Sequence, residues 1–192
     1  LLNFLKSQFP QITSLLYCIN DKGNDSLYDQ NIVCYYGQDF ITEHLGDLQF
    51  KITAKSFYQT NPKQAETLYA IGKEFANLKG SEIVYDLYTG TGTIALSLAK
   101  QCAKVIGIES VPEAIEAAQE NAKLNSIENA SFEVGDMKAC FNDDFIEKYG
   151  RADVVITDPP RDGMHKDVVA QLLKLSPKRI VYISCNSATQ AR

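Results

Sequence analysis

The sequence has little that would place the protein in a membrane or in an oxidising compartment. No apolar run approaches the roughly 18 residues that a helix needs to cross a bilayer. The first residues show no charged-then-apolar pattern of a signal peptide. The five cysteines are odd in number and scattered, without a Cys-x-x-C pair or a Cys/His cluster at metal-ligand spacing. These absences predict reduced thiols, a cytoplasmic location and no metal site.

The chain also lacks the excess of positive charge that is typical of proteins binding nucleic acids on their own. Its 19 Lys and Arg residues are outnumbered by 24 Asp and Glu residues, so the formal net charge is −5. Because neutralised phosphates supply much of the affinity for nucleic acids, we do not expect tight binding by this chain alone. With 192 residues, 45% of them hydrophobic, the chain is long enough for one core and a small appendage.

The N-terminal part of the chain has short strand-like segments joined by turn-forming residues. A helical end over residues 1–9 stops before Pro10. The strand-like runs that follow lie at 14–20, 31–36, 40–44 and 48–53. This pattern predicts a small antiparallel β segment over residues 1–52.

From residue 53 onward, helical and strand patterns alternate. Helices are expected at 62–78, 93–101, 112–125, 141–149 and 166–175. The strands between and after them are expected at 82–87, 104–109, 130–135, 153–157 and 179–184. Their near-continuous apolar residues fit a parallel sheet that is covered by helices on both faces. The sequence therefore predicts an α/β class with a mostly parallel sheet.

A glycine turn follows the first strand of this α/β part. Gly90 and Gly92 let the chain turn sharply and let a ligand approach the backbone near a helix N-terminus. Glu109 ends the next strand, where a carboxylate accepts hydrogen bonds from ribose hydroxyls, and Asp136 after the third strand would lie beside the base. Asp86 beneath the turn would disfavour a pyrophosphate. We predict S-adenosylmethionine here, with a nicotinamide or flavin, or a turn without ligand, as alternatives.

Two further motifs follow later strands of the same sheet. Asp158 follows the fourth strand, and we expect it to point into the same crevice as Gly90, the alternative being a cap on the next helix. Arg161 would bind a phosphate or pair with a nearby acid. Cys185 is expected to end the fifth strand, among polar neighbours that would stabilise a thiolate. We predict that Cys185 is a nucleophile and that the other four cysteines are not.

Four motifs in this order resemble the RNA uracil-C5 methyltransferases, which make 5-methyluridine in ribosomal or transfer RNA. They are Ser56-Phe57-Tyr58-Gln59-Thr60-Asn61-Pro62, Asp86-Leu87-Tyr88-Thr89-Gly90-Thr91-Gly92, Asp158-Pro159-Pro160-Arg161, and Ser184-Cys185-Asn186 with Ala188-Thr189. The resemblance implies a Rossmann-like class I S-adenosylmethionine-dependent methyltransferase fold, with the catalytic domain at 53–192 and part of a central, RNA-facing β segment at 1–52. It also implies a monomer.

The implied reaction transfers a methyl group from S-adenosylmethionine to C5 of a uridine in RNA, leaving S-adenosylhomocysteine. The expected substrate is ribosomal RNA, specifically 23S RNA, ahead of transfer RNA. The catalytic positions implied are Cys185, which would add to C6 of the uracil, and Asp158. Cofactor-binding positions are Gln59, Tyr88, Gly90, Gly92, Glu109, Asp136 and Asp158, and substrate-binding positions are Phe57, Gln59 and Arg161.

The family also has parts that are not found in this sequence. Its general base is a glutamate in a segment beyond the cysteine, which would lie after Arg192. It usually has an N-terminal RNA-binding barrel, and some members hold an iron–sulfur cluster with four cysteines. We therefore expect a truncated catalytic portion whose sheet lacks its last strands and leaves 179–184 at an open edge. Such a piece would bind S-adenosylmethionine without completing turnover.

Three alternatives remain open at this point. RNA cytosine-C5 methyltransferases would have a cysteine inside the strand-four motif, where this chain has Asp-Pro-Pro-Arg. Amino-group methyltransferases use an aromatic residue at the position of Arg161 and need no thiol. A non-catalytic RNA-binding fragment is the third alternative, because the chain is acidic and lacks the expected base.

Overall fold

The computed structural model describes residues 1–23, 27 and 29–191. Its centre is a five-stranded sheet in the order β7-β6-β5-β8-β9, and every neighbouring pair is parallel. The strands are β5 (Ile83–Leu87), β6 (Lys104–Glu109), β7 (Ala130–Val134), β8 (Val154–Thr157) and β9 (Arg179–Tyr182). The predicted parallel sheet is confirmed, and β9 is its outermost described strand on one side.

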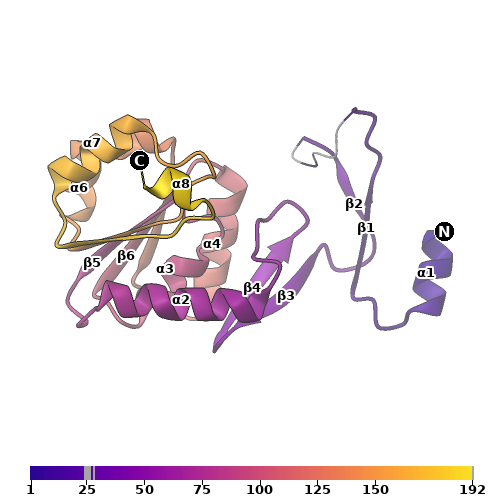
Figure 1. Cartoon of the computed structure of the whole chain (residues 1–192). Helices are drawn as coiled ribbons and strands as arrows, with labels where there is room; N and C mark the ends of the chain where they lie inside the picture. Colours follow the sequence, from indigo (N-terminus) through magenta and orange to yellow (C-terminus); the bar gives the residue numbers. More distant parts are fainter. Residues whose placement is uncertain (24–26, 28, 192) are drawn as a thin grey trace.

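Helices cover both faces of this sheet (Figure 1). They are α2 (Pro62–Ala76), α3 (Thr93–Ala99), α4 (Pro112–Leu124), α5 (Met137–Cys140), α6 (Asp143–Tyr149), α7 (Lys166–Leu175) and α8 (Ser187–Gln190). The helix predicted at 141–149 begins two residues later than predicted, at Asp143. Asn142 instead caps α6 by accepting a hydrogen bond from the Phe145 N–H at 3.0 Å, and the short α5 precedes it.

The core is divided into two clusters because successive strand residues face opposite sides of the sheet. Val84, on one face, packs with residues of α2, α3 and α4, whereas Tyr85, on the other, packs with residues of α5, α6 and α7. The Tyr85 ring makes edge contacts with Phe141 and Phe145, at centroid distances of 6.2 and 5.1 Å. Burial on both faces explains why these strands are apolar without alternation.

The N-terminal part forms two separate antiparallel hairpins after α1 (Leu2–Gln8). The first pairs β1 (Ser14–Cys18) with β2 (Ile32–Gly37), and the second pairs β3 (Phe40–Leu45) with β4 (Leu48–Thr53). Figure 1 shows α1 and the first hairpin at the end of the molecule farthest from α6 and α7. The predicted antiparallel β segment is confirmed, as two hairpins.

The second hairpin packs directly on the α/β part. Phe50 is fully buried in the same core cluster as Val84. The backbone N–H groups of Gln49 and Lys51 donate to the side-chain oxygens of Asn125 and Asn121 on α4, both at 2.8 Å. These bonds satisfy the free edge of β4. A domain boundary between residues 52 and 53 stays a prediction, and the β3–β4 hairpin shares its core with the sheet.

Among the described residues, no helix combines the length and the apolar character needed to cross a membrane.

Candidate active site

A cavity of about 600 Å³ lies at the edge of the sheet where the strands end. Segments far apart in the sequence form its wall: the loop before α2, the glycine turn after β5, and the chain after β6, β8 and β9. Such an edge is where open α/β sheets bind ligands. Eight of the predicted site residues line it, namely Phe57, Gln59, Tyr88, Gly90, Glu109, Asp158, Arg161 and Cys185.

The turn after β5 has an unusual backbone. Tyr88, Gly90 and Gly92 all have positive φ, at 64°, 55° and 82°. For Tyr88 this left-handed conformation costs energy, since its side chain crowds the backbone. A Cβ on Gly90 would meet nothing within 4 Å, so the space above this glycine is open to a ligand.

Gly92 has a different environment from Gly90. A Cβ there would lie 3.1 Å from the Ala118 Cβ and from the ring of Phe132. Gly92 is buried and is not part of the cavity lining. The structure thus places Gly92, at the start of α3, close against Ala118 of α4 and Phe132 of β7. Its predicted contact with a cofactor stays a prediction.

Asp86 lies under the glycine turn and is fully buried. Its Oδ2 accepts hydrogen bonds from the Thr89 hydroxyl at 2.6 Å and from the Ala95 N–H at 3.0 Å. Its Oδ1 has no partner within the described part of the chain, and Asp86 does not line the cavity. Burial raises the pKa of Asp86 to about 7, with further upward contributions from Asp158 and Glu109. Asp86 therefore holds the turn from below.

The Glu109 carboxylate joins the ends of two neighbouring strands. Its Oε2 accepts a hydrogen bond from the Gly90 N–H at 3.2 Å. Its Oε1 accepts from the N–H groups of Ser110 and Val111, at 2.7 and 3.1 Å. These bonds fix the carboxylate in the cavity wall, at the strand end that the sequence predicted.

Asp136 lines a smaller cavity of about 170 Å³. Tyr88 and Ser110 line both this cavity and the larger one, so the two adjoin. The Asp136 carboxylate also caps α5, by accepting from the Lys138 N–H at 2.9 Å. The smaller cavity thus extends the main cavity past Tyr88, and Asp136 lies in this extension.

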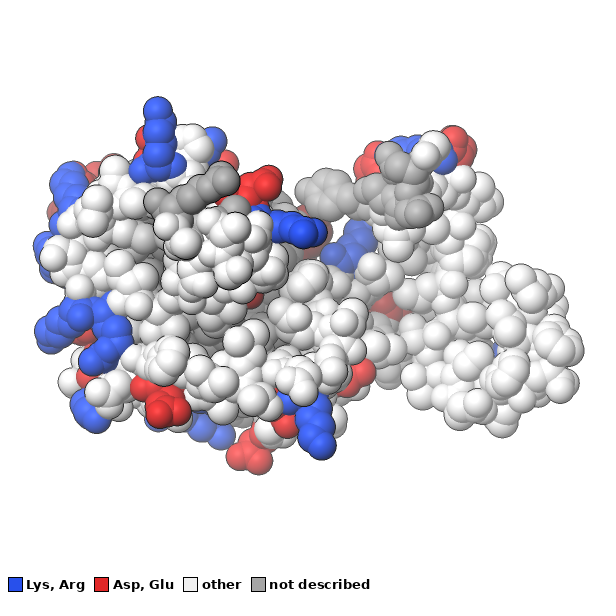
Figure 2. Space-filling model, viewed as in Figure 1, with Lys and Arg blue, Asp and Glu red and all other residues white. Residues whose placement is uncertain are grey.

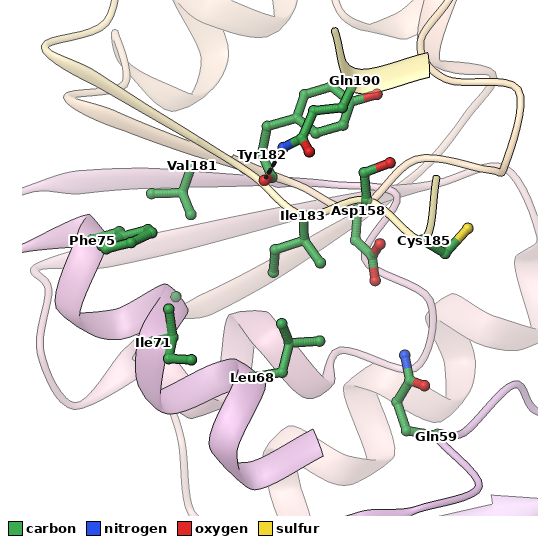
Figure 3. A pocket seen from close by; sticks show the side chains of 12 residues that line it. Gln59, Leu68, Ile71, Phe75, Asp158, Val181, Tyr182, Ile183, Cys185 and Gln190 are labelled. Carbon is green, nitrogen blue, oxygen red and sulfur yellow. Dashed lines mark hydrogen bonds between the residues drawn. The ribbon is translucent and has the colours of Figure 1, made fainter. Parts of the chain in front are cut away.

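Asp158 follows β8 and lines both the main cavity and a groove of about 380 Å³ between α2 and β9. Burial raises the pKa of its carboxyl group. Figure 3 shows the Asp158 carboxylate and the Gln59 side chain directed toward each other, with Cys185 beside them. The alternative of Asp158 as a helix cap is not supported, because His165 is the N-cap of the next helix, α7.

Cys185 is exposed and lies three residues beyond β9, rather than at its last residue. It lines the main cavity together with Asp158 and Gly90. Burial raises the pKa of Tyr182, and the negative charge of the nearby Asp158 adds a smaller upward effect. Cys102, in contrast to the exposed Cys185, is buried. Burial raises the pKa of the Cys102 thiol to about 11.

The polar neighbours of Cys185 build the turn that presents it. The Asn186 N–H donates to the Ser184 hydroxyl at 3.1 Å, and the Ser184 hydroxyl donates to the Asn186 carbonyl at 2.9 Å. The Asn186 side chain caps α8 by accepting from the Ala188 N–H at 3.1 Å. The sequence predicts that these groups stabilise a thiolate, and in the structure their bonds also build the turn.

Two predicted substrate residues lie at the rim of the cavity. Phe57 is 74% exposed and lines the main cavity and a second cavity of about 170 Å³ over Gly90 and Glu109. Arg161 is exposed beside Pro160. An exposed aromatic ring and a cation that line the same cavity are suited to a base and a phosphate.

Three buried polar side chains of this cavity were not among the predicted site residues, namely Tyr69, Thr89 and Thr91. The Tyr69 hydroxyl lies 3.3 Å from the Thr93 hydroxyl. The Thr91 hydroxyl is buried, and none of the residues that the structure describes is its partner. Tyr69 falls in the apolar period of α2, so its position alone indicated a core residue. Among the described residues, no group of three or more His, Cys, Asp or Glu side chains could hold a metal ion.

Comparisons with known proteins identify the family of the chain. The sequence model of the tRNA (uracil-5-)-methyltransferase family matches residues 29–192. The chain belongs to this family. The resemblance predicted from the four motifs is thereby confirmed.

The curated proteins that are similar in sequence are described as RNA methyltransferases. The chain is 60% identical over its whole length to an uncharacterized RNA methyltransferase of Porphyromonas gingivalis, and it covers 41% of that protein. It is 57% identical to a protein of the same description in Bacteroides thetaiotaomicron, of which it covers 42%. The chain therefore spans well under half the length of these relatives.

A solved structure is similar over almost the whole chain. It is the tRNA (uracil-54, C5)-methyltransferase of Pyrococcus abyssi, determined in complex with S-adenosyl-L-homocysteine. The TM-score is 0.77 at 36% sequence identity, and the match covers 94% of this chain and 43% of that one. The predicted methyltransferase fold is thereby confirmed.

Proposed function

We propose that the protein transfers a methyl group from S-adenosylmethionine to C5 of a uridine in RNA, through a covalent bond between Cys185 and C6 of the uracil. One observation carries this proposal. The exposed thiol of Cys185 lines the same cavity as the glycine turn and Glu109. A nucleophile and a cofactor-binding turn that line one cavity can bring the thiol and the methyl donor to the same base.

The residues present fit S-adenosylmethionine. The space above Gly90 is open, and the buried hydroxyl of the neighbouring Thr91, which lines the cavity, has no partner among the described residues. Asp86, Glu109 and Asp158 make the surroundings acidic, which suits a ligand with an ammonium and a sulfonium group better than a pyrophosphate. When bound, this cofactor supplies an electrophilic methyl carbon on a positively charged sulfur.

Each end of the cofactor has candidate partners. Glu109 would accept hydrogen bonds from the ribose hydroxyls. Asp136, in the adjoining cavity past Tyr88, would face the base. Gln59 and Asp158 would hold the amino-acid end and the uracil, and Gly92 would contribute by shaping the turn.

The chain's own groups account for the activation of the uracil. C5 is a poor nucleophile until the Cys185 sulfur adds to C6, which moves an electron pair through C5 and C4 onto O4. A Gln59 N–H would stabilise the charge on O4, and Phe57 would stack on the ring. After methylation a base removes the C5 proton, and the electron pair of that C–H bond re-forms the C5–C6 double bond as the Cys185 thiolate leaves. The family resemblance puts that base beyond Arg192.

The proposal also concerns which RNA is the substrate. The motifs resemble those of enzymes for which we expect 23S ribosomal RNA as the substrate, whereas the name of the P. abyssi protein gives transfer RNA as its substrate. Figure 2 shows Lys and Arg side chains mixed with Asp and Glu over the visible face, without a continuous basic patch. We propose that other parts of the protein supply most of the RNA affinity, and that it acts as a cytoplasmic monomer.

The test uses the protein at its natural length with S-adenosylmethionine labelled on the methyl group. Unmodified 23S ribosomal RNA and unmodified transfer RNA are supplied separately, and nucleosides are analysed by mass spectrometry. We expect 5-methyluridine with the wild type, and a loss of about a thousandfold in rate with Cys185→Ala. The matched control is Cys34→Ala, which removes another exposed thiol and should leave the rate unchanged.

Each result has a defined meaning. Label in 5-methyluridine of only one RNA identifies the substrate. Label in 5-methylcytidine, or equal activity of Cys185→Ala and the wild type, contradicts the proposed reaction.

A further inference from the structure

Two segments from different parts of the chain form the wall of the main cavity near the proposed cofactor and uracil. The glycine turn after β5 contributes Gly90 and Thr91, and the loop between β4 and α2 contributes Phe57 and Gln59. Phe57, Gly90 and Thr91 also line the second cavity, of about 170 Å³, together. A methyl donor on the turn can reach a uracil on the loop only if these two segments keep a fixed spacing.

A fully buried side chain joins the glycine turn to β4. Asn121 on α4 is 0% exposed. Its side-chain N–H donates to the Thr91 carbonyl at 3.2 Å, and its side-chain oxygen accepts from the Lys51 N–H at 2.8 Å. The carboxamide therefore bonds to the turn with one end and to β4 with the other.

The strand β4 leads directly into the loop that carries Phe57 and Gln59. It ends at Thr53, two residues after Lys51. The Thr53 N–H donates to the Ser56 hydroxyl at 3.1 Å, and the Ser56 N–H donates to the Thr53 carbonyl at 3.0 Å. These bonds hold the start of the loop on the end of the strand, so the position of β4 sets the position of Phe57.

Asn125, four residues further along α4, makes a similar contact with β4. Its side-chain oxygen accepts from the Gln49 N–H at 2.8 Å, and its side-chain N–H groups donate to the carbonyls of Gln49 and Asn121, both at 2.7 Å. Both asparagines thus hold β4 on α4. Within the described part of the chain, Asn121 is the one of the two whose side chain is also bonded to the glycine turn.

We propose that Asn121 is a positioning residue, which fixes the spacing between the glycine turn and the loop after β4 and so aligns the methyl donor with the uracil. The inference rests on the proposed function. Because the Asn121 side chain is held at both ends before any ligand arrives, this alignment needs no further ordering when the ligands bind. Without the side chain, each segment can still bind its own ligand, but the geometry that methyl transfer requires is lost.

The first test compares Asn121→Ala with Asn125→Ala in the protein at its natural length, with the RNA that accepts the methyl label. Asn121→Ala should lower kcat about thirtyfold while KM for the RNA and Kd for S-adenosylhomocysteine stay within about threefold, because alignment matters most in the transition state. Asn125→Ala is the matched control, since it also removes bonds to β4, and it should leave kcat within about threefold.

A second readout uses the wild type and no RNA, so it does not depend on how well a variant folds. S-adenosylhomocysteine should slow amide hydrogen exchange at Lys51, which Asn121 joins to the turn, about fivefold more than at Gln49, which is bonded to Asn125. NMR measures both amides in the same sample. Equal exchange effects at the two amides, or equal losses of kcat in the two variants, would overturn the inference.

The two proposals fail in different ways. A wild-type protein that binds S-adenosylhomocysteine but methylates no RNA contradicts the proposed function, and the exchange at Lys51 and Gln49 then still decides whether Asn121 links the turn to β4. A wild type that methylates uridine, with the same kcat in Asn121→Ala, contradicts the role of Asn121 and leaves the proposed function in place.

Discussion

The two ends of the five-stranded sheet are built for different purposes. At the end where the strands begin, two carboxylates are held by partners. Asp153 accepts from the Ile83 N–H at 3.0 Å and pairs with Lys178 at 2.9 Å. Glu82 accepts from three successive backbone N–H groups, those of Lys79, Gly80 and Ser81. At the end where the strands finish, the carboxylates line or underlie a cavity.

The pKa shifts at these two ends have opposite signs. Hydrogen bonds lower the pKa of Asp153 and Glu82, with Lys178 and the Lys79 N–H as the largest causes. Burial raises the pKa of Asp86 and Asp158. One end therefore stabilises the fold at neutral pH, and the other carries unfavourable charge. Such a cost is typical of a site that is shaped for a ligand.

The largest effect on stability should come from the glycine turn. Gly92→Ala forces a Cβ into a left-handed residue, 3.1 Å from Ala118 and Phe132, and should lower the free energy of unfolding by about 3 kcal/mol. Gly80→Ala, at the other end of the sheet, meets no neighbour within 4 Å and should cost only about 1 kcal/mol of backbone strain. Denaturant unfolding of both variants measures the difference. Equal losses would contradict the close packing assigned to Gly92.

A smaller, pH-dependent effect should separate Asp86 from Asp153. The folded-state pKa of Asp86 is raised, so the neutral carboxyl stabilises the fold at low pH, and this contribution is lost as the pH rises toward about 7. Asp86→Asn should therefore be more stable than the wild type at pH 8, by about 2 kcal/mol, and the gain should shrink toward pH 4.

Asp153→Asn is the matched opposite. Its folded-state pKa is lowered, so the carboxylate stabilises the fold above its ordinary pKa, and this contribution is lost as the pH falls. The variant should be slightly less stable than the wild type at pH 8, by less than about 1 kcal/mol, because the group is partly exposed. Thermal unfolding from pH 4 to pH 8 tests both variants. A change of the same sign in both would show that the two ends do not differ.

The sequence was sufficient to predict the sheet and most of the cavity wall. Buried parallel strands are recognisable as apolar runs, and their ends converge on one edge, so Glu109, Asp158 and Cys185 could be brought together from sequence order alone. Tyr69 could not be placed in this way. A tyrosine in the apolar period of a helix looks the same whether its hydroxyl faces the core or a cavity, and its contact with Thr93 depends on how α2 packs on α3.

Two other features depended on tertiary structure. The β3–β4 hairpin shares the core of the sheet because Asn121 and Asn125 of α4 bond to the edge of β4, a pairing across about 70 residues of chain that no local pattern indicates. Asp86 was expected to face the ligand. Its bonds to Thr89 and Ala95 instead turn it into the support of the glycine turn.

The most direct test of the central claim is to trap the covalent bond between Cys185 and the uracil. RNA that contains 5-fluorouridine has no C5 proton to lose, so the adduct cannot resolve after methylation. With the protein at its natural length and S-adenosylmethionine, we predict a denaturant-resistant complex whose RNA fragment is found by mass spectrometry on the peptide that contains Cys185. A complex attached through another residue, or one that forms equally with Cys185→Ala, would contradict the account.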